Sequence, residues 1–244
     1  MKTVFHKADT RGVANHGWLK SFHTFSFADY HNPERVNFGV LRVINEDRVQ
    51  GSKGFGTHPH RDMEIISIPL SGALEHKDSM GNGSVIKRGE VQVMSAGTGV
   101  THSEFNASDN EIVHFLQIWV FSREKGVKPR YQQEPIAQFL KENEFQQILS
   151  PNQDDQGVWI HQDAWFSWAE FSEDTKSSYT IKRKDNGAYF FVISGSVEIA
   201  GQKLNPSDGF GVWETDEVSV NASKDAVVLV MDVPMELPEY LFKR

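Results

Sequence analysis

The sequence contains no cysteine, and that absence removes several kinds of site at once. Disulfide bonds, thiolate nucleophiles, zinc fingers and cysteine-ligated clusters are all excluded. A transition-metal site in this chain must therefore be built from imidazole and carboxylate ligands. A chain without cysteine also suits a reducing compartment.

Long apolar runs and an excess of positive charge are missing as well. No run of about 18 apolar residues occurs, so we expect no membrane-spanning helix. The N-terminus lacks the apolar core of a secretory signal, which favours a cytoplasmic protein. The net charge is −8, with 25 Lys and Arg against 33 Asp and Glu, and this argues against direct nucleic-acid binding. The nucleotide and flavin fingerprints G-x-G-x-x-G and G-x-x-x-x-G-K-[ST] are absent, as is the nucleophile elbow G-x-S-x-G.

Most of the 244 residues form short apolar segments separated by Gly, Asn, Asp and Pro. We expect strands at 36–43, 64–70, 83–87, 90–95, 111–121, 188–193, 196–200 and 226–233. Turn signals every 8–12 residues or so are typical of all-β sandwiches and barrels. The stretch 122–150 differs, because helix-like spacing of Ile136, Phe139 and Leu140, followed by Phe145, predicts a connector with a short helix. A second short helix is expected in 236–244, starting near Pro238.

Two β units share a pattern. The apolar-Ser-Gly string at 70–72 matches the one at 193–195, and Ile86 matches Leu204 further along. An acidic residue, Glu90 or Asp208, follows in each copy. Two ordered matches of this kind predict an internal duplication.

Ligand-type residues are concentrated in the first unit. His58 and His60 lie two apart where a strand begins, and His102 and Glu104 repeat this spacing downstream. Residues two apart in a strand point to the same face, so neighbouring strands would bring three imidazoles and one carboxylate together. Such a set suits Fe(II), Mn, Ni, Cu or Zn. Glu64 has the same parity as His58 and His60, so spacing alone leaves the choice of carboxylate open.

The second unit lacks such a set. The duplication places Ile181 and Arg183 opposite His58 and His60, and Gly187 opposite Glu64. It places Val220 and Ala222 opposite His102 and Glu104. No histidine follows His161, which we expect to be a solvated or loop residue. The second unit is therefore predicted to hold no comparable metal.

Longer strings resemble a known family. H-x-H with a following Glu and Gly, and a later His102 with Asn106, resemble the cupin pattern, although Ser95 stands where that pattern has Pro. The strings FHTFSFADY (22–30), FGVLRVINEDRV (38–49), HPHRDMEI (58–65) and AGTGVTHSE (96–104) resemble the pirin family, densely over 1–125 and more loosely afterwards. The resemblance implies an all-β bicupin of two antiparallel β-barrels (double-stranded β-helices). We expect an N-terminal metal-binding barrel at 1–125, a connector at 126–155 and a barrel without ligands at 156–244.

The resemblance also implies a site and an activity. The ligands would be His58, His60, His102 and Glu104 around one divalent metal, with Fe(II) favoured. Bacterial members are associated with quercetin 2,3-dioxygenase activity, in which O₂ opens the flavonol ring and CO is released. Glu104 would then accept the proton of the flavonol 3-hydroxyl, and Glu64 could orient an imidazole instead of binding metal. The alternatives are an iron-dependent redox sensor that binds a protein partner, as in eukaryotic relatives, and a metal-loaded structural barrel.

An apolar mouth and supporting polar groups are also expected around the metal. The candidates for apolar walls are Phe25, Phe27, Phe38, Phe55 and Met63. The candidates for groups that orient the ligands are His23, His114 and Gln117.

Overall fold

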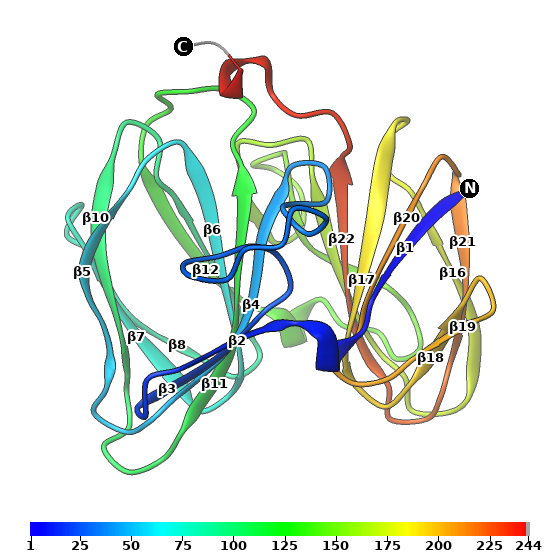
Figure 1. The fold of residues 1–244 in the computed structure, drawn as a ribbon, viewed down its shortest axis with the longest axis horizontal. Helices are drawn as coiled ribbons and strands as arrows, with labels where there is room; N and C mark the ends of the chain where they lie inside the picture. Colours follow the sequence, from blue (N-terminus) through cyan, green and yellow to red (C-terminus); the bar gives the residue numbers. More distant parts are fainter. Residues whose placement is uncertain (243–244) are drawn as a thin grey trace.

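The computed structural model describes residues 1–242 as two β-rich halves placed side by side (Figure 1). Each half contains one seven-stranded and one four-stranded sheet. The seven-stranded sheets lie toward the middle of the molecule, and the four-stranded sheets lie on the outside (Figure 1). No helix among the described residues is both long enough and apolar enough to cross a bilayer.

The N-terminal half consists of two sheets, with strand orders β12-β9-β6-β11-β4-β3-β2 and β5-β10-β7-β8. Its strands are β2 (Gly12–Asn15), β3 (Leu19–His23), β4 (Leu41–Val49), β5 (Gly54–His60), β6 (Met63–Ser71), β7 (Ala73–Asp78), β8 (Gly83–Lys87), β9 (Glu90–Ser95), β10 (Val100–Asn106), β11 (Val113–Phe121) and β12 (Arg130–Pro135).

The C-terminal half has the orders β1-β20-β17-β22-β15-β13-β14 and β16-β21-β18-β19. Its strands are β1 (Lys2–His6), β13 (Gln146–Ser150), β14 (Val158–Trp159), β15 (Trp165–Glu170), β16 (Thr175–Thr180), β17 (Asn186–Ser194), β18 (Val197–Ile199), β19 (Gln202–Leu204), β20 (Gly209–Trp213), β21 (Glu217–Ala222) and β22 (Val227–Pro234). Only three turns of 3₁₀ helix are described: η1 (Ala8–Thr10), η2 (Ile136–Gln138) and η3 (Glu239–Leu241).

The sheet orders of the two halves correspond position by position, as an internal duplication predicts. Both halves place a glycine with positive φ at the same hairpin, Gly72 at 73° and Gly195 at 65°. A Cβ at either position would lie about 3 Å or less from the backbone of the facing residue, Val113 or Ala226. Only glycine therefore lets this turn pack against the neighbouring strand in each half.

The edge strands cross between the halves. β12 completes the N-terminal sheet by pairing with β9, while β1, from the start of the chain, takes the same position in the C-terminal sheet beside β20. The expected division places β1 in the N-terminal segment 1–125 and β12 in the connector 126–155. In the structure, β1 pairs in the C-terminal sheet and β12 in the N-terminal sheet, so the chain crosses between the halves at both strands.

The nearly all-β prediction is confirmed, and two finer expectations are wrong. The two sheets of each half do not close into a barrel. The predicted connector helix is replaced by strands β12 and β13 around the three-residue turn η2. The apolar residues that suggested a helix instead anchor a loop, because Ile136 is buried and Phe139 and Leu140 pack against the same core. The Gln- and Glu-rich segment forms an edge strand, where one side faces solvent.

The ends of two predicted segments also differ from the structure. The strand expected at 36–43 begins only at Leu41, because Gly39, with φ of 52°, turns the chain against Pro234. Residues 83–87 and 90–95 coincide with β8 and β9. In the tail, the expected helix is only the turn η3, and residues 243–244 of that prediction lie outside the described residues.

The largest apolar core lies between the halves. It joins residues of both seven-stranded sheets, including Ile66, Leu116 and Ile118 from one side and Tyr189, Leu229 and Met231 from the other. Each such fully buried side chain contributes about 1.5–3 kcal/mol relative to an exposed one. The two halves are therefore held together by a hydrophobic core that they share.

Candidate metal centre

Strands β5 and β10 bring the predicted histidines together. His102 pairs directly with His58, and Val100 pairs with His60. The ring centroids lie 4.4 Å apart for His58 and His102, 4.8 Å for His58 and His60, and 4.9 Å for His60 and His102. One nitrogen of each ring lies within 4.8 Å of the others. The three imidazoles, called the histidine trio below, thus converge on one point.

Burial keeps two of these imidazoles, His60 and His102, in the neutral form that binds metals. Burial, followed by the neighbouring His58, lowers the pKa of His60 to about 4. Burial and the surrounding histidines His58, His60 and His76 lower the pKa of His102 to about 2. The buried Nε2 of His102 has no hydrogen-bond partner among the described residues. An unpartnered imidazole nitrogen within a cluster of three histidines suits a divalent metal, so these residues fit one.

Glu104 reaches the same region from β10, after a bulge that separates its pairing from that of His102. Its carboxylate is buried, and Gln117 Nε2 donates to its Oε2 at 2.7 Å. Ser67 Oγ lies 3.2 Å from Oε1 of Glu104 and 3.0 Å from Oε1 of Gln117. Burial raises the pKa of Glu104, against the hydrogen bond from Gln117 and the charges of His76 and His58. An oxygen of Glu104 lies within 4.8 Å of nitrogens of His102 and His76.

Glu64 lies elsewhere. Its carboxylate accepts hydrogen bonds from Ser95 Oγ at 2.6 Å and Ser122 Oγ at 3.0 Å, and none of its described contacts is with the trio. The strand parity that joined it to His58 and His60 is broken by the turn at Asp62, where φ is 50°. Neither metal binding by Glu64 nor its orientation of an imidazole has a contact to support it.

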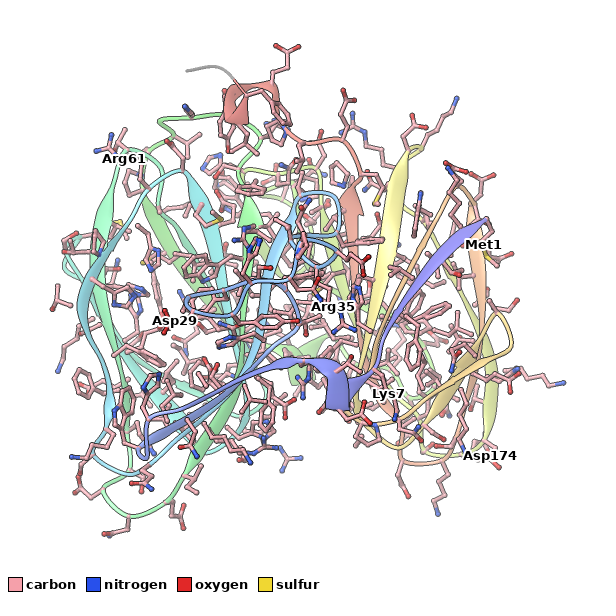
Figure 2. The ribbon with its side chains drawn as sticks, viewed as in Figure 1. Met1, Lys7, Asp29, Arg35, Arg61 and Asp174 are labelled. Carbon is pink, nitrogen blue, oxygen red and sulfur yellow. The ribbon has the colours of Figure 1, made fainter. Side chains whose placement is uncertain are left out.

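A cavity of about 210 Å³ adjoins the centre. Its apolar lining includes Leu19, Phe27, Phe55 and Trp119, and His58 and Glu104 reach it from the metal side. Figure 2 shows Asp29, close in sequence to Phe27, in front of the space between the two sheets of this half. The loop that carries Phe27 and Ala28 lines the cavity.

A second part of the cavity lining is polar. His23, Asn45 and Asp47 are buried there, and each has a side-chain atom without a hydrogen-bond partner among the described residues. Burial, opposed by a hydrogen bond from Ser21 and reinforced by the charge of Glu104, raises the pKa of Asp47 to about 7. Groups of this kind can take up the hydroxyls of a ligand.

The structure separates the candidates for supporting residues. Phe27 and Phe55 line the cavity, and His23 lines it as well. Phe25 and Phe38 belong instead to the core between the halves, and Met63 packs against the cluster around Ile65.

The remaining candidates also have separate places. Gln117 contacts Glu104, as described above. His114 lies away from the trio, where its Nε2 is 2.8 Å from Oε1 of Glu46. His161 is a half-buried loop residue that stacks edge-on against Trp159.

Three residues near the centre were missed from the sequence. His76, on β7, is fully buried, and its ring centroid is 5.3 Å from that of His102. Trp119 stacks edge-on against His60 at 4.9 Å, and Asp47 lines the cavity. The available signal was the alternation on β7 and β11, which places His76 with Leu74 and Trp119 with Gln117 on faces that turn out to be interior.

Comparison with known proteins decides the family. Residues 4–120 match the family model described as Pirin, and residues 147–233 match the one described as Quercetinase C-terminal cupin domain. The chain is 44% identical over 229 residues to a quercetin 2,3-dioxygenase of Escherichia coli K12, covering 93% of this chain and 97% of that protein. The chain belongs to the pirin family. A pirin-like protein of Caulobacter vibrioides is 36% identical over 92% of this chain and 96% of its own length.

A solved pirin structure shows the same fold with a metal. The bacterial pirin YhhW from Escherichia coli in complex with nickel(II) is 42% identical and has a TM-score of 0.90. The similarity covers 96% of this chain and 99% of that chain. Together with the cluster of histidines and Glu104, these relatives support a single divalent metal in this pirin.

Proposed function

We propose that this pirin is a metal-dependent dioxygenase that opens the ring of a flavonol such as quercetin with O₂ and releases CO. The observation that carries the proposal is the position of a polar-and-apolar cavity directly beside His58 and Glu104. The similarity to a protein named quercetin 2,3-dioxygenase over nearly the whole chain supports the substrate class.

The proposed ligands are His58, His60, His102 and Glu104, with Fe(II) favoured and Mn, Ni, Cu or Zn as alternatives. His58 Nδ1 donates to the Gly56 carbonyl oxygen at 2.8 Å, which leaves Nε2 for the metal. When bound, such a metal supplies Lewis acidity that favours ionisation of a hydroxyl group in contact with it. This donor set of nitrogens with one oxygen fits a divalent transition metal and leaves room for exogenous ligands.

Glu104 is proposed to accept the proton of the flavonol 3-hydroxyl. Burial makes its carboxylate more basic, and Gln117 holds Oε2 in place at 2.7 Å. A buried acceptor with a raised pKa suits proton transfer near neutral pH. Gln117 and Ser67 would keep the carboxylate oriented before and after the proton arrives.

The cavity then orients the ring system. Phe27, Phe55 and Trp119 provide apolar walls, while His23, Asn45 and Asp47 offer partners to further hydroxyls. About 210 Å³ is less than the roughly 300 Å³ of the smaller drug-sized sites. A flavonol would therefore place its reacting end inside the cavity and leave part of its ring system outside it.

The test is metal loading followed by turnover. Protein reconstituted with Fe(II) should bind about one metal per chain, consume O₂ and release CO with quercetin, with a kcat on the order of 1 per second. Glu104→Gln should lower kcat at least about 100-fold, because general base catalysis of this kind contributes roughly that factor. His58→Ala with His60→Ala should remove both metal and turnover, whereas the control His161→Gln should keep both.

The outcomes separate the alternatives. Loaded protein that turns over quercetin no faster than free metal would reject the enzyme and favour the redox sensor with a protein partner. Full metal retention in the double histidine variant would reject the ligand set. A cytoplasmic location stays a prediction.

A further inference from the structure

Each of the three histidines of the trio is oriented by a different kind of contact. His58 donates from Nδ1 to a backbone carbonyl, and His60 lies against the edge of Trp119. His102 contacts another imidazole, because its Nδ1 lies 3.4 Å from Nδ1 of His76. Among the three histidines, only His102 thus has a hydrogen-bond partner, His76, that can either donate or accept according to its tautomer.

His76 is fixed on both sides. It is fully buried on β7, where it pairs with Glu104 of β10, and its ring packs against Tyr131 at a centroid distance of 4.9 Å. Its second nitrogen, Nε2, lies 3.1 Å from Oδ2 of Asp78. The ring therefore bridges Asp78 and His102.

The carboxylate of Asp78 already has its acceptor positions filled. Oδ1 accepts from the backbone N–H groups of Met80 at 2.9 Å and Asn82 at 3.0 Å. Oδ2 accepts from Asn82 Nδ2 at 2.9 Å in addition to facing His76. These three N–H donors from Met80 and Asn82 stabilise Asp78 as a charged carboxylate, so its Oδ2 accepts from His76 Nε2–H.

The protonation pattern follows from this acceptor. If Asp78 accepts from His76 Nε2–H, then the neutral His76 offers the lone pair of Nδ1. His102 must then donate from its own Nδ1, which leaves the lone pair on its buried, unpartnered Nε2. The opposite pattern would bury an Nε2–H of His102 that has no acceptor among the described residues.

We propose that Asp78 and His76 form a hydrogen-bond chain that positions His102 and fixes it in the Nδ1–H tautomer, ready to bind metal through Nε2. His76 is a positioning residue in this chain. The arrangement extends the usual carboxylate–histidine–metal triad by one imidazole. The carboxylate at its far end raises the basicity of His102 Nε2 and so strengthens its bond to a metal.

The C-terminal half shows that the fold itself does not need this chain. Counted from the shared glycine turn, Ile199 occupies the position of His76, and it pairs with Val220 as His76 pairs with Glu104. Both residues belong to an apolar core. A buried His–Asp pair beside β10 is therefore particular to the half that carries the trio.

The inference rests on the proposed metal site, so its test includes a readout that needs neither metal nor turnover. Protein labelled with ¹⁵N-histidine is examined by long-range ¹H–¹⁵N NMR, metal-free and loaded with Zn²⁺. In both states His102 should be in the Nδ1–H tautomer. His76→Phe should convert metal-free His102 into a mixture of tautomers. His76→Gln, whose amide can accept from His102 and donate to Asp78, should restore the single tautomer.

Metal affinity gives the second readout. Competition with a chelator for Ni²⁺ should show a 10- to 100-fold loss in His76→Phe, the range typical for the loss of such an orienting partner. His76→Gln should recover most of that loss. The matched control is His114→Phe, which removes another histidine beside a carboxylate in the same half and should change Ni²⁺ affinity less than twofold.

The contrary results are separable from failure of the proposed function. An unchanged His102 tautomer in His76→Phe, or equal losses of affinity in His76→Phe and His114→Phe, would overturn the chain. Absence of metal binding or quercetin turnover in the unaltered protein would reject the proposed function, while the tautomers of the metal-free protein would still decide the chain.

Discussion

The two halves share a strand order but fill their interiors differently. From the common turn at Gly72 and Gly195, the pairings align His76 with Ile199, Glu104 with Val220, His102 with Val218 and His58 with Tyr179. The C-terminal residues at these positions all belong to one buried apolar cluster. In the N-terminal half, the apolar residues outside the shared core form two smaller clusters. The polar centre of the N-terminal half therefore occupies positions that the C-terminal half fills with a continuous apolar core.

The difference between the two interiors is tested most strongly by a carboxylate at the position of the C-terminal half that is equivalent to Glu104. Val220→Glu buries a charge without partners and should cost about 3–5 kcal/mol of the free energy of unfolding. The reciprocal Glu104→Gln, measured on metal-free protein, should cost about 1 kcal/mol or less. Urea unfolding of the two variants checks both values. Similar losses in the two would show that the halves tolerate polar groups equally.

A bound metal should stabilise the folded protein through the site in the N-terminal half alone. At a free concentration 100 times its Kd, Ni²⁺ should add about 2.7 kcal/mol to the unfolding free energy by mass action. His58→Ala with His60→Ala should abolish the gain. Because the halves share a core, we expect thermal unfolding to remain one transition that moves as a whole. Splitting into a metal-sensitive and a metal-insensitive transition would contradict that shared core.

Asp47 gives the N-terminal half a pH dependence. Burial raises its pKa from 3.8 to about 7, so the folded metal-free protein binds this proton more tightly than the unfolded chain. Its contribution to stability is therefore lost as pH rises from about 4 to about 7, on the order of 4 kcal/mol. Asp47→Asn should flatten this decline in urea midpoints between pH 5 and pH 8. The exposed Asp29→Asn serves as the control and should follow the unaltered protein.

A small effect is also expected at Ser67. Its position corresponds to Phe190 in the C-terminal core, yet it holds a hydroxyl that contacts Glu104 and Gln117. Ser67→Ala should cost only about 0.5–1.5 kcal/mol, the net value of one hydrogen bond. Differential scanning calorimetry of metal-free protein measures it. A loss of several kcal/mol would mean that the polar network, and not the apolar clusters, holds this interior together.

The sequence predicted the β class and the convergence of the trio because both depend on local spacing. H-x-H and H-x-E each lie within one strand, where alternation alone places side chains on a common face. His76 escaped because its contact with His102 depends on how β7 pairs with β10, which no local pattern specifies. Glu64 misled for the opposite reason, since a turn at Asp62 reversed a parity that looked continuous.

The duplicated register was also displaced by a turn. Val220 was expected opposite His102, and Ala222 opposite Glu104, but the pairings place Val218 and Val220 there. The turn before β10 is two residues longer than its counterpart before β21, which sequence matching across β9 and β20 cannot detect. The conclusion that the second half offers no such ligands is unaffected by the displacement.

The position of β1 ties the order of synthesis to the order of folding. Residues 2–6 are made well before their partner β20, at residues 209–213. Until then, the first strand has no sheet to join, and closing so long a loop makes this step slow. The N-terminal half can pair its strands earlier, whereas the sheet of the C-terminal half becomes complete only when β1 pairs with β20.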